Sequence, residues 1–579
     1  MSPGSEKALE EVRGGGVRRA PRAPRARDLS ALVWILSAAT LTALVILPLG
    51  WVLARSLQGG TGLTLGNYRA IVADGRYLRV VLNSLSMALG AGALAVAVGA
   101  AMGWLVARTD LPLRGGIRTL TLASFVTPPF LGAFAWEMLA GPNAGLLNSA
   151  YRALTGSGGH LFNIYSLAGL TFVIALYTFP YVFIMTTNAL QTVPAEMEET
   201  AAILGASSLR TGLTITFPLV APALVGGFIL AFLDALSLFG SPAILAMPAG
   251  IHTITTQIWA FFQYPPRAEE AAAFSFSLLV ATAALLLVQR WILGRRGFAT
   301  VGGQGSAGRV ARLGWRKIPA LAFCLSALAC SIFLPYYVLL RAAFSKVWSL
   351  PLSPDNFTLR NWIFVISGSG GTKVAILNTL QLGVLTATVG AALAGLIAYI
   401  VSRRVVRGSH VLAFLALAPL VIPGIVLGIG LLMAYSRPPF LLYGTLWILF
   451  LAYLTKGMPV AFSQSDAVFK TVHPELEEAG RVFGATRLCV LRDITAPLAK
   501  SGVLAAWALL FIGSIRELSA SIMLFTPQTR VVSVIIFDLK EEGQFGVIAA
   551  LAVVLLAITI AVLMAIQRLL GRDLLGARV

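Results

Sequence analysis

Runs of apolar residues, each close to twenty residues long, alternate with short polar segments along almost the whole chain. A helix needs about 20 apolar residues to cross the ~30 Å of hydrocarbon in a bilayer. The pattern therefore predicts an all-α polytopic membrane protein with about twelve transmembrane helices in two six-helix halves. The predicted spans lie around 29–54, 80–107, 117–140, 162–190, 219–241 and 272–293 in the first half, and around 319–343, 375–401, 411–434, 442–464, 499–524 and 547–568 in the second.

One polar stretch occurs twice, 279 residues apart, and we name the copies the first acidic loop (191–217) and the second acidic loop (470–496). In each copy a proline and three glutamates come together, a combination that favours the start of a helix. Small residues follow, and a glycine (Gly205, Gly484) can take the left-handed conformation that ends a helix. We predict a helix, a tight turn and a second helix. An ordinary acidic loop could explain one copy, but two copies in register argue against it.

Further sequence matches relate the two halves. Residues 82–85 (LNSL) match 377–380 (LNTL), and 106–108 match 401–403, both at a shift of 295. Because the shift is only 279 at the acidic loops, sixteen extra residues are expected in the first half, in the Gly-rich outer loop 141–162. Both halves thus have the same predicted topology, a parallel repeat about an axis along the membrane normal.

The distribution of basic residues predicts the orientation. With the N-terminus in the cytoplasm, the inner segments hold 29 of the 44 Lys and Arg residues and the outer segments hold 13. Such an excess marks the cytoplasmic side of a membrane protein. Both termini and both acidic loops are therefore expected in the cytoplasm. With 57% hydrophobic and 12% charged residues, the net charge of +20 indicates membrane topology rather than nucleic-acid binding.

The acidic loops resemble the EAA loops of ABC-importer permeases, with Glu-x-x-x-Gly-like spacing and a proline further on (Pro218, Pro497). Residues 199–201 depart from Glu-Ala-Ala in the middle position and 478–480 in the last, each by a small residue. The resemblance implies that each loop docks as a coupling helix into a groove of a cytoplasmic ATPase subunit. The candidate coupling residues are Glu198, Glu199, Ala202 and Gly205 in the first loop, and Glu477, Glu478, Gly480 and Gly484 in the second.

The resemblance covers both halves and implies a fused permease. The expected parts are a disordered basic cytoplasmic tail (1–28), a first permease half (29–293), a cytoplasmic linker (294–318), a second half (319–569) and a cytoplasmic tail (570–579). The implied partners are two copies of an ATPase subunit that hold the ATP, a periplasmic or extracellular substrate-binding protein and the lipid bilayer, with no nucleic acid. No cofactor is expected on this chain, and the implied location is the bacterial inner membrane.

The chain offers no arrangement typical of an enzyme active site. Residues 368–373 are the nearest approach to a phosphate-binding loop, but their lysine follows the threonine, whereas the motif requires Gly-Lys-Ser/Thr. The four histidines are scattered, and the three cysteines form neither a disulfide framework nor a metal-ligand spacing. ATP hydrolysis is therefore expected in a separate polypeptide.

Ionisable residues inside predicted spans indicate function, because each costs roughly 2.5–3.5 kcal/mol at the helix centre. Asp234 is expected ~24 Å from the inner surface, and Arg516 and Glu517 at nearly the same depth in the equivalent helix of the second half. With Ser237 and Ser519 they are the candidates for a translocation path between the halves. The alternative is an ion pair from Arg516 to Asp234 or Glu517 that only holds the halves together.

Two other charged residues have structural interpretations. Glu137 lies near the outer end of its predicted helix and is expected at the membrane interface. Lys456 is expected close enough to the inner side for its ammonium group to reach that surface.

Residues 516–521, followed by 534–538 and 541–545, resemble the fused permeases of ferric-iron importers, and residues 239–242 are similar to their corresponding stretch. This implies ferric iron as the cargo, handed over by a binding protein, so a metal-ligand cluster in the permease is not expected. Related permeases serve thiamine, polyamines and aminoethylphosphonate, which remain alternatives. A secondary transporter of the major-facilitator type also has two parallel six-helix halves, but that class does not explain the duplicated acidic loops.

Overall fold

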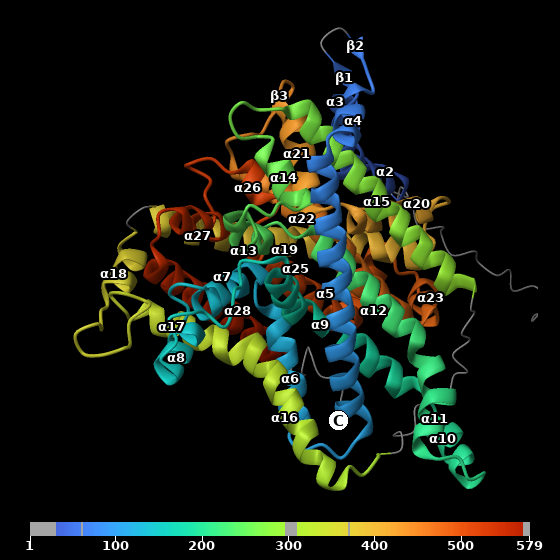
Figure 1. The fold of residues 1–579 in the computed structure, drawn as a ribbon. Helices are drawn as coiled ribbons and strands as arrows, with labels where there is room; N and C mark the ends of the chain where they lie inside the picture. Colours follow the sequence, from blue (N-terminus) through green and yellow to red (C-terminus); the bar gives the residue numbers. More distant parts are fainter. Residues whose placement is uncertain (1–29, 60–61, 296–309, 369–370, 571–579) are drawn as a thin grey trace, which may run out of the picture.

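The computed structural model describes residues 30–59, 62–295, 310–368 and 371–570. The predicted N-terminal tail, the C-terminal tail beyond residue 570 and residues 296–309 of the predicted linker lie outside the described residues. The described chain is almost entirely helical, as predicted. Figure 1 shows a bundle of long helices, with short helices and a projecting hairpin at its ends.

The first half contains six long helical segments. They are α2 (Ser30–Leu41) continued by η1 (Thr42–Ile46) and α3 (Leu47–Ser56), then α5 (Gly75–Arg108), α6 (Arg114–Val126) with α7 (Pro129–Ala140), α9 (Leu167–Thr192), α12 (Phe217–Ser237) and α15 (Ala268–Arg295). The short elements are β1 (Gln58–Gly59), β2 (Gly62–Leu63), α4 (Gly66–Ala73), α8 (Leu146–Thr155), α10 (Ala195–Ile203), α11 (Ser208–Thr211), η2 (Gly212–Thr216), α13 (Gly240–Leu245), η3 (Met247–Ala249) and α14 (Ile254–Ala260).

The second half repeats this order. Its long segments are α16 (Lys317–Leu328) continued by η5 (Ala329–Phe333) and α17 (Leu334–Ala343), then α19 (Thr372–Ser402), α20 (Ser409–Leu417) and η7 (Ala418–Val421) with α21 (Gly424–Tyr435), α22 (Leu446–Thr471), α25 (Ala496–Ile515) and α28 (Phe545–Leu570). The short elements are η4 (Gly314–Arg316), α18 (Arg360–Ser367), β3 (Ser436–Arg437), β4 (Phe440–Leu441), α23 (Pro474–Val482), α24 (Arg487–Val490), η8 (Leu491–Thr495), α26 (Ser521–Leu524) and α27 (Val532–Glu541).

Two of the predicted spans are broken rather than continuous. In the described residues, ten helices are long and apolar enough to cross a membrane, while the spans predicted at 117–140 and 411–434 bend by 99° and 112°. Prolines cause both breaks, because a proline lacks the N–H needed by the helix and forces the residue before it into an extended conformation. Accordingly Thr127 before Pro128, and Ile422 before Pro423, have extended backbones.

Each broken span still carries the chain from one end of the bundle to the other. Arg108, at the end of α5, donates to the carbonyl oxygens of Leu190 and Val193 at the end of α9, so these two helices end side by side. The chain must therefore return between them, and Ile164, just before α9, donates to Ala140 at the end of α7. In the second half Arg403 connects the ends of α19 and α22 in the same way. If each broken span counts as one crossing, the described residues provide up to twelve crossings.

The extra residues of the first half lie where the sequence predicted. Between α7 and α9 the chain has residues 141–166, which include α8, whereas between α21 and α22 it has only residues 436–445. The difference is the sixteen residues by which the repeat shift changes. The six long helical segments follow one another in the same order in both halves.

The repeated LNSL and LNTL motifs perform the same task in both halves. Ser84 accepts a hydrogen bond from the first N–H of α14 at 2.7 Å, and Thr379 accepts one from the first N–H of α27 at 2.9 Å. Asn83 and Asn378, one residue earlier, each donate to a carbonyl of the loop before that short helix. The motif thus anchors a short helix that would otherwise begin with unsatisfied N–H groups.

The first span of each half packs against the other half, so that the halves interlock. Tyr435 of α21 donates to the carbonyl of Ala43 in η1 at 2.9 Å, and Gly430 lies against Pro48 of α3. In the reciprocal contact, Cys324 and Leu328 of α16 share a buried apolar cluster with α5, α6 and α9. The interlocked halves enclose a central region into which α7 is buried along its whole length.

Candidate functional site

The two acidic loops form the same helix, turn and helix, as predicted. The turn glycines Gly205 and Gly484 have φ angles of +84° and +88°, a conformation that favours glycine. The residue after each glycine donates back five positions, Ala206 to Ala201 at 2.9 Å and Ala485 to Gly480 at 3.1 Å, which closes the end of the first helix. In Figure 1 the loops lie on the same side of the bundle, with α10 and α11 at the lower right and α23 above them.

In the first acidic loop, Glu198 points into its own half of the bundle. Its Oε2 lies 3.5 Å from Nη1 of Arg108, and its Oε1 accepts a hydrogen bond from Thr216 at 2.8 Å. The other terminal nitrogen of Arg108 donates to the carbonyls of Leu190 and Val193. The Arg108 and Glu198 side chains are 5% and 12% exposed. They therefore fasten α10 to the ends of α5 and α9.

The second acidic loop has the same anchor with shorter contacts. Glu477 Oε1 accepts from Nε of Arg403 at 2.8 Å and from Thr495 at 2.9 Å, and its Oε2 accepts from the Tyr399 hydroxyl at 3.3 Å. Arg403 also donates to the carbonyl of Val472 at 2.7 Å. Both predicted coupling residues Glu198 and Glu477 thus hold the loop to the bundle and do not face outward.

The outward surface of each loop is formed by the next residues. Among the other predicted coupling residues, Glu199, Glu478, Gly205 and Gly484 are exposed, while Ala202 and Gly480 are half-buried. An apolar pair at the end of each first helix is also exposed: Leu204 is 82% and Phe483, its counterpart, is 91% exposed, and Ile203 and Val482 precede them. Exposed apolar pairs at matched positions are typical of a surface that a partner covers.

The described end of the linker attaches beside the first acidic loop. We call residues 310–317 the linker strap. Asp110, two residues after Arg108, accepts from the N–H of Leu313 at 2.9 Å and pairs with Lys317 at 2.8 Å. The Leu313 hydrogen bond and the Lys317 ammonium group lower the pKa of Asp110 below its usual value, because both stabilise the carboxylate.

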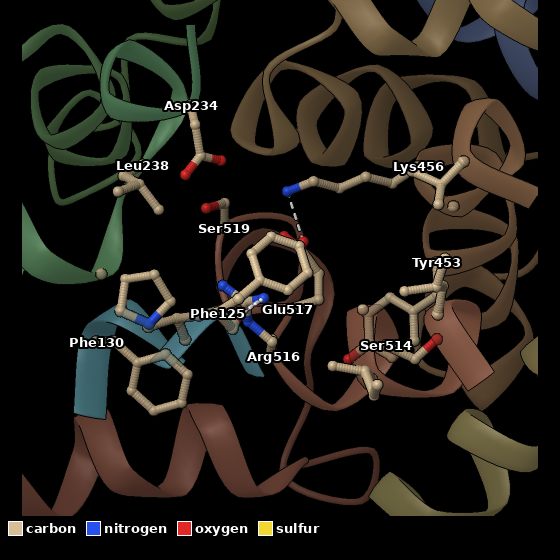
Figure 2. Close-up of a pocket in the computed structure, with 18 of the residues that line it drawn as sticks. Phe125, Phe130, Asp234, Leu238, Tyr453, Lys456, Ser514, Arg516, Glu517 and Ser519 are labelled. Atoms are coloured by element: carbon tan, nitrogen blue, oxygen red, sulfur yellow. Dashed lines mark hydrogen bonds and ion pairs between the residues drawn. The ribbon is translucent and has the colours of Figure 1, made fainter. Parts of the chain in front are cut away.

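A cavity of about 250 Å³ lies between the two halves. Four of the five residues predicted for a translocation path line it: Asp234, Arg516, Glu517 and Ser519. Ser237 is half-buried at the end of α12, and it is not among the lining residues. Arg516 to Ala520 were predicted within a continuous helix, but α25 ends at Ile515, so this segment forms a non-helical connection to α26. Figure 2 shows the side chains from both halves that meet in the cavity.

Arg516 connects the second half to the break in the first. Its Nη1 donates to the carbonyl of Phe125 at 2.5 Å, and its guanidinium lies 5.3 Å from the centre of the Phe125 ring. In an unbroken helix this carbonyl would accept from residue 129, but Pro129 has no N–H to give. The second break has a matching contact, since Thr282 of the first half donates to the carbonyl of Val421 at 2.7 Å.

The predicted position of the Lys456 side chain was wrong. It was expected to reach the inner surface, but its ammonium group lies 2.5 Å from Oε2 of Glu517 in the cavity, and Figure 2 shows this pair. Lys456 lies near the middle of α22, too far from either end for its side chain to leave the bundle. The N-terminus of α21 closes over the pair so tightly that a Cβ on Gly424 would lie 2.7 Å from the Lys456 ammonium nitrogen and 2.9 Å from Oε1 of Glu517.

The predicted alternative, an ion pair from Arg516 to Asp234 or Glu517, does not form among the described residues. Glu517 pairs with Lys456 instead, and Arg516 bonds to a backbone carbonyl. The carboxylate of Asp234 points into the cavity (Figure 2), with no described cation within 4.0 Å of it. The cavity therefore holds one satisfied ion pair and two charges without an oppositely charged neighbour in contact.

Glu137 lies near the end of α7, as predicted, and its side chain is buried in the protein. Its Oε1 accepts from the Tyr165 hydroxyl at 2.8 Å, and its Oε2 is buried without a hydrogen bond. The bend at Thr127 turns α7 into the interior of the bundle, which a continuous span could not do. Over the described ranges, no group of three or more His, Cys, Asp or Glu side chains has the arrangement of a metal site.

Sequence reasoning did not identify the two anchoring arginines, although a signal was present. Arg108 and Arg403 were aligned by the shift of 295 that also aligns the LNSL and LNTL motifs. Their partners Glu198 and Glu477 are aligned by the other shift, 279. An arginine and a glutamate that both occur at equivalent positions of the two halves are candidates for a mutual contact. Comparing the two alignments would have suggested the pairs Arg108–Glu198 and Arg403–Glu477.

Comparison with known proteins adds a family match and several relatives. Residues 80–296 and 388–576 each match the family described as binding-protein-dependent transport system inner membrane component, and each stretch contains one acidic loop. The ferric transport system permease protein FbpB of Actinobacillus pleuropneumoniae is 25% identical over 505 residues, which are 86% of this chain and 72% of that protein.

Two further relatives are similar to different extents of the chain. The putative ferric transport system permease protein FbpB 1 of Haemophilus influenzae is 26% identical over 472 residues, covering 80% of this chain and 72% of that protein. The putative 2-aminoethylphosphonate transport system permease protein PhnV of Salmonella paratyphi A is 31% identical over 241 residues, which are 42% of this chain and 89% of that protein.

Proposed function

This chain belongs to the family of binding-protein-dependent transport system inner membrane components, and from that premise we propose that it forms the membrane path of an ATP-driven importer for ferric iron. The observation that carries the proposal is the pairing of two features. Matched acidic loops lie on one side of the bundle, and a charged cavity lies between the two halves that bear them.

The acidic loops are suited to receive mechanical force. The buried pairs Arg108–Glu198 and Arg403–Glu477 fasten each loop to its own half, so that a pull on the loop moves the half. The exposed apolar residues beside Glu199 and Glu478 are the surface that an ATPase subunit would cover. In this proposal two ATPase copies bind and hydrolyse ATP, and this chain contributes contact rather than chemistry.

Transport then requires the halves to separate. The cavity lies where broken helices of both halves meet, an arrangement that transporters use for cargo sites near the middle of the membrane. A binding protein would deliver cargo at the end of the bundle opposite the acidic loops, and both termini would be cytoplasmic. When the ATPase subunits close, the halves would rock apart at the outer end, and the contact from Arg516 to Phe125 would open.

Ferric iron is supported by the two FbpB relatives, whose similarity extends over at least 80% of this chain. A second candidate, 2-aminoethylphosphonate, is supported by the higher identity of the shorter PhnV relative. A secondary transporter of the major-facilitator type is not favoured, because it provides no role for two acidic loops with exposed apolar tips.

The test uses the full chain with the ATPase and binding protein encoded by neighbouring genes, reconstituted in proteoliposomes. Glu199→Arg together with Glu478→Arg should abolish ATP-driven uptake and association with the ATPase, while the permease still inserts. The control for association with the ATPase is Glu541→Arg with Glu542→Arg, which should leave that association unchanged, because these exposed carboxylates lie where α27 ends, at the end of the bundle away from the acidic loops. Normal uptake by the first double variant would rule out the docking role.

A further inference from the structure

The cavity between the halves contains two charges that no contact in the described residues neutralises. The carboxylate of Asp234 has no described cation within 4.0 Å, and the guanidinium of Arg516 has no described carboxylate within that distance. By contrast, Lys456 and Glu517 form a contact pair, and Glu517 also accepts from the N–H of Ala520 at 2.9 Å. The satisfied pair and the two unpaired charges thus share one chamber.

Unpaired charges are costly at this depth of a membrane protein, where they normally pair with each other or line a water-filled path. A cavity of about 250 Å³ can hold several waters or one small solute. Water alone would solvate both groups, but it does not explain why the acid comes from α12 of the first half and the base from the connection after α25 of the second. Because Asp234 and Arg516 belong to different halves, a solute bound to both would lie between the two halves that move during transport.

The groups that remain available in the cavity are of two kinds. The oxygen groups are the Asp234 carboxylate and the hydroxyls of Tyr181 and Ser519, which line the cavity and have no hydrogen bond to another described residue. The nitrogen groups are those N–H groups of Arg516 that do not donate to the Phe125 carbonyl. Oxygen ligands suit hard cations or an ammonium group, and a guanidinium suits carboxylate, phosphate or phosphonate oxygens.

We infer that the cavity receives a small cargo that presents a cationic centre and an oxyanion together, with Asp234 facing the cation and Arg516 facing the oxyanion. This inference rests on the proposed function and specifies its cargo. Ferric iron accompanied by an oxyanion such as citrate has this chemistry, and so does 2-aminoethylphosphonate, with its ammonium and phosphonate groups. In the iron case Asp234 supplies one ligand, and the accompanying anion and water supply the others.

The experiment measures initial uptake rates in proteoliposomes that contain the complete importer, with ferric citrate and 2-aminoethylphosphonate as separate probes. Asp234→Asn and Arg516→Gln should each lower uptake of the transported probe by about tenfold or more, the effect of losing a charged hydrogen bond. Asp234→Glu, which keeps the charge, should retain more uptake than Asp234→Asn. Glu137→Gln is the control, since it neutralises a buried carboxylate outside the cavity, and it should stay within about twofold of the wild type.

The two probes distinguish the sources of the shared chemistry. If 2-aminoethylphosphonate is transported, Asp234→Asn should abolish the preference over ethylphosphonate, which lacks the ammonium group, whereas Arg516→Gln should impair both compounds. If Asp234→Asn or Arg516→Gln takes up the transported probe at the wild-type rate, the inference is overturned while the proposed function stands. Equal impairment by Asp234→Asn and Asp234→Glu would overturn it in the same way. Uptake of neither probe by the wild type would overturn both.

Discussion

The anchor of the second acidic loop allows a quantitative test. Glu477→Ala removes a carboxylate that is only 12% exposed and that accepts hydrogen bonds from Arg403, Thr495 and Tyr399. It leaves the equally buried guanidinium of Arg403 without its charge partner. The bond from Arg403 to the Val472 carbonyl remains, so the loop should loosen without unfolding the bundle.

The size of the effect follows from these contacts. Breaking a buried ion pair by removing one partner costs about 3–5 kcal/mol, and the partial exposure of both side chains favours the lower limit. We therefore expect the free energy of local opening of α23 to fall by about 3 kcal/mol, which corresponds to amide exchange on the order of 100-fold faster. Glu198→Ala should have a smaller effect, because the Arg108–Glu198 distance is 3.5 Å.

Hydrogen exchange measured on the permease in lipid nanodiscs checks this expectation, with peptides that cover residues 472–496. Glu478→Ala is the matched control, because it removes the neighbouring but exposed carboxylate, and it should change the opening free energy by less than about 0.5 kcal/mol. A double-mutant cycle with Arg403→Ala should recover a coupling energy for the pair. Exchange in Glu477→Ala that equals exchange in Glu478→Ala would refute the anchoring role.

Three other changes have defined outcomes. Gly424→Ala should displace the Lys456–Glu517 pair and lower transport severalfold, whereas Gly513→Ala, whose Cβ would meet nothing within 4 Å in the same cavity, should be neutral in the uptake assay. Thr379→Val leaves the first N–H of α27 without an acceptor and should destabilise that helix by about 1–3 kcal/mol, measured by amide exchange. The pKa of Asp110 is lowered in the folded protein, so its carboxylate stabilises the linker strap above the usual Asp range, and this stabilisation is lost as pH falls through the lowered pKa. Amide exchange in the strap should therefore rise only below about pH 4. In Asp110→Asn it should already be raised at neutral pH.

Much of the cavity and the loops could be predicted from the chain alone, because the relevant signals are local or periodic. The acidic loops were recognisable from a proline, glutamates and a glycine at fixed spacing, which are the local requirements for starting and ending a helix. Asp234, Arg516 and Glu517 were recognisable because a charge within an apolar run is rare. Their meeting in one cavity followed from the duplication, which places equivalent helices at equivalent depths.

The direction of a side chain could not be predicted in the same way. Glu477 and Glu478 are adjacent in sequence, yet one is buried against Arg403 and the other is exposed, because the rotation of α23 about its axis depends on its neighbours. Lys456 was placed at the wrong depth because its partner, Glu517, is 61 residues away in sequence. The burial of Glu137 could not be predicted, because the bend before α7 leaves the hydropathy pattern of the span unchanged.

The amino-acid order by itself determined the positions of the apolar helices, the twofold repeat and the two acidic loops, because bilayer thickness and helix capping impose requirements that a short stretch of chain meets alone. Only the packing of the halves decided which charges pair and which remain unpaired. A charged side chain pairs with a residue that is distant in sequence. Which pairs form depends on how the first span of each half packs against the other half, and on the backbone carbonyl that each helix break leaves without an intrahelical donor. The pairing of Lys456 with Glu517, which leaves Asp234 and Arg516 open to the cavity, is a property of that assembly.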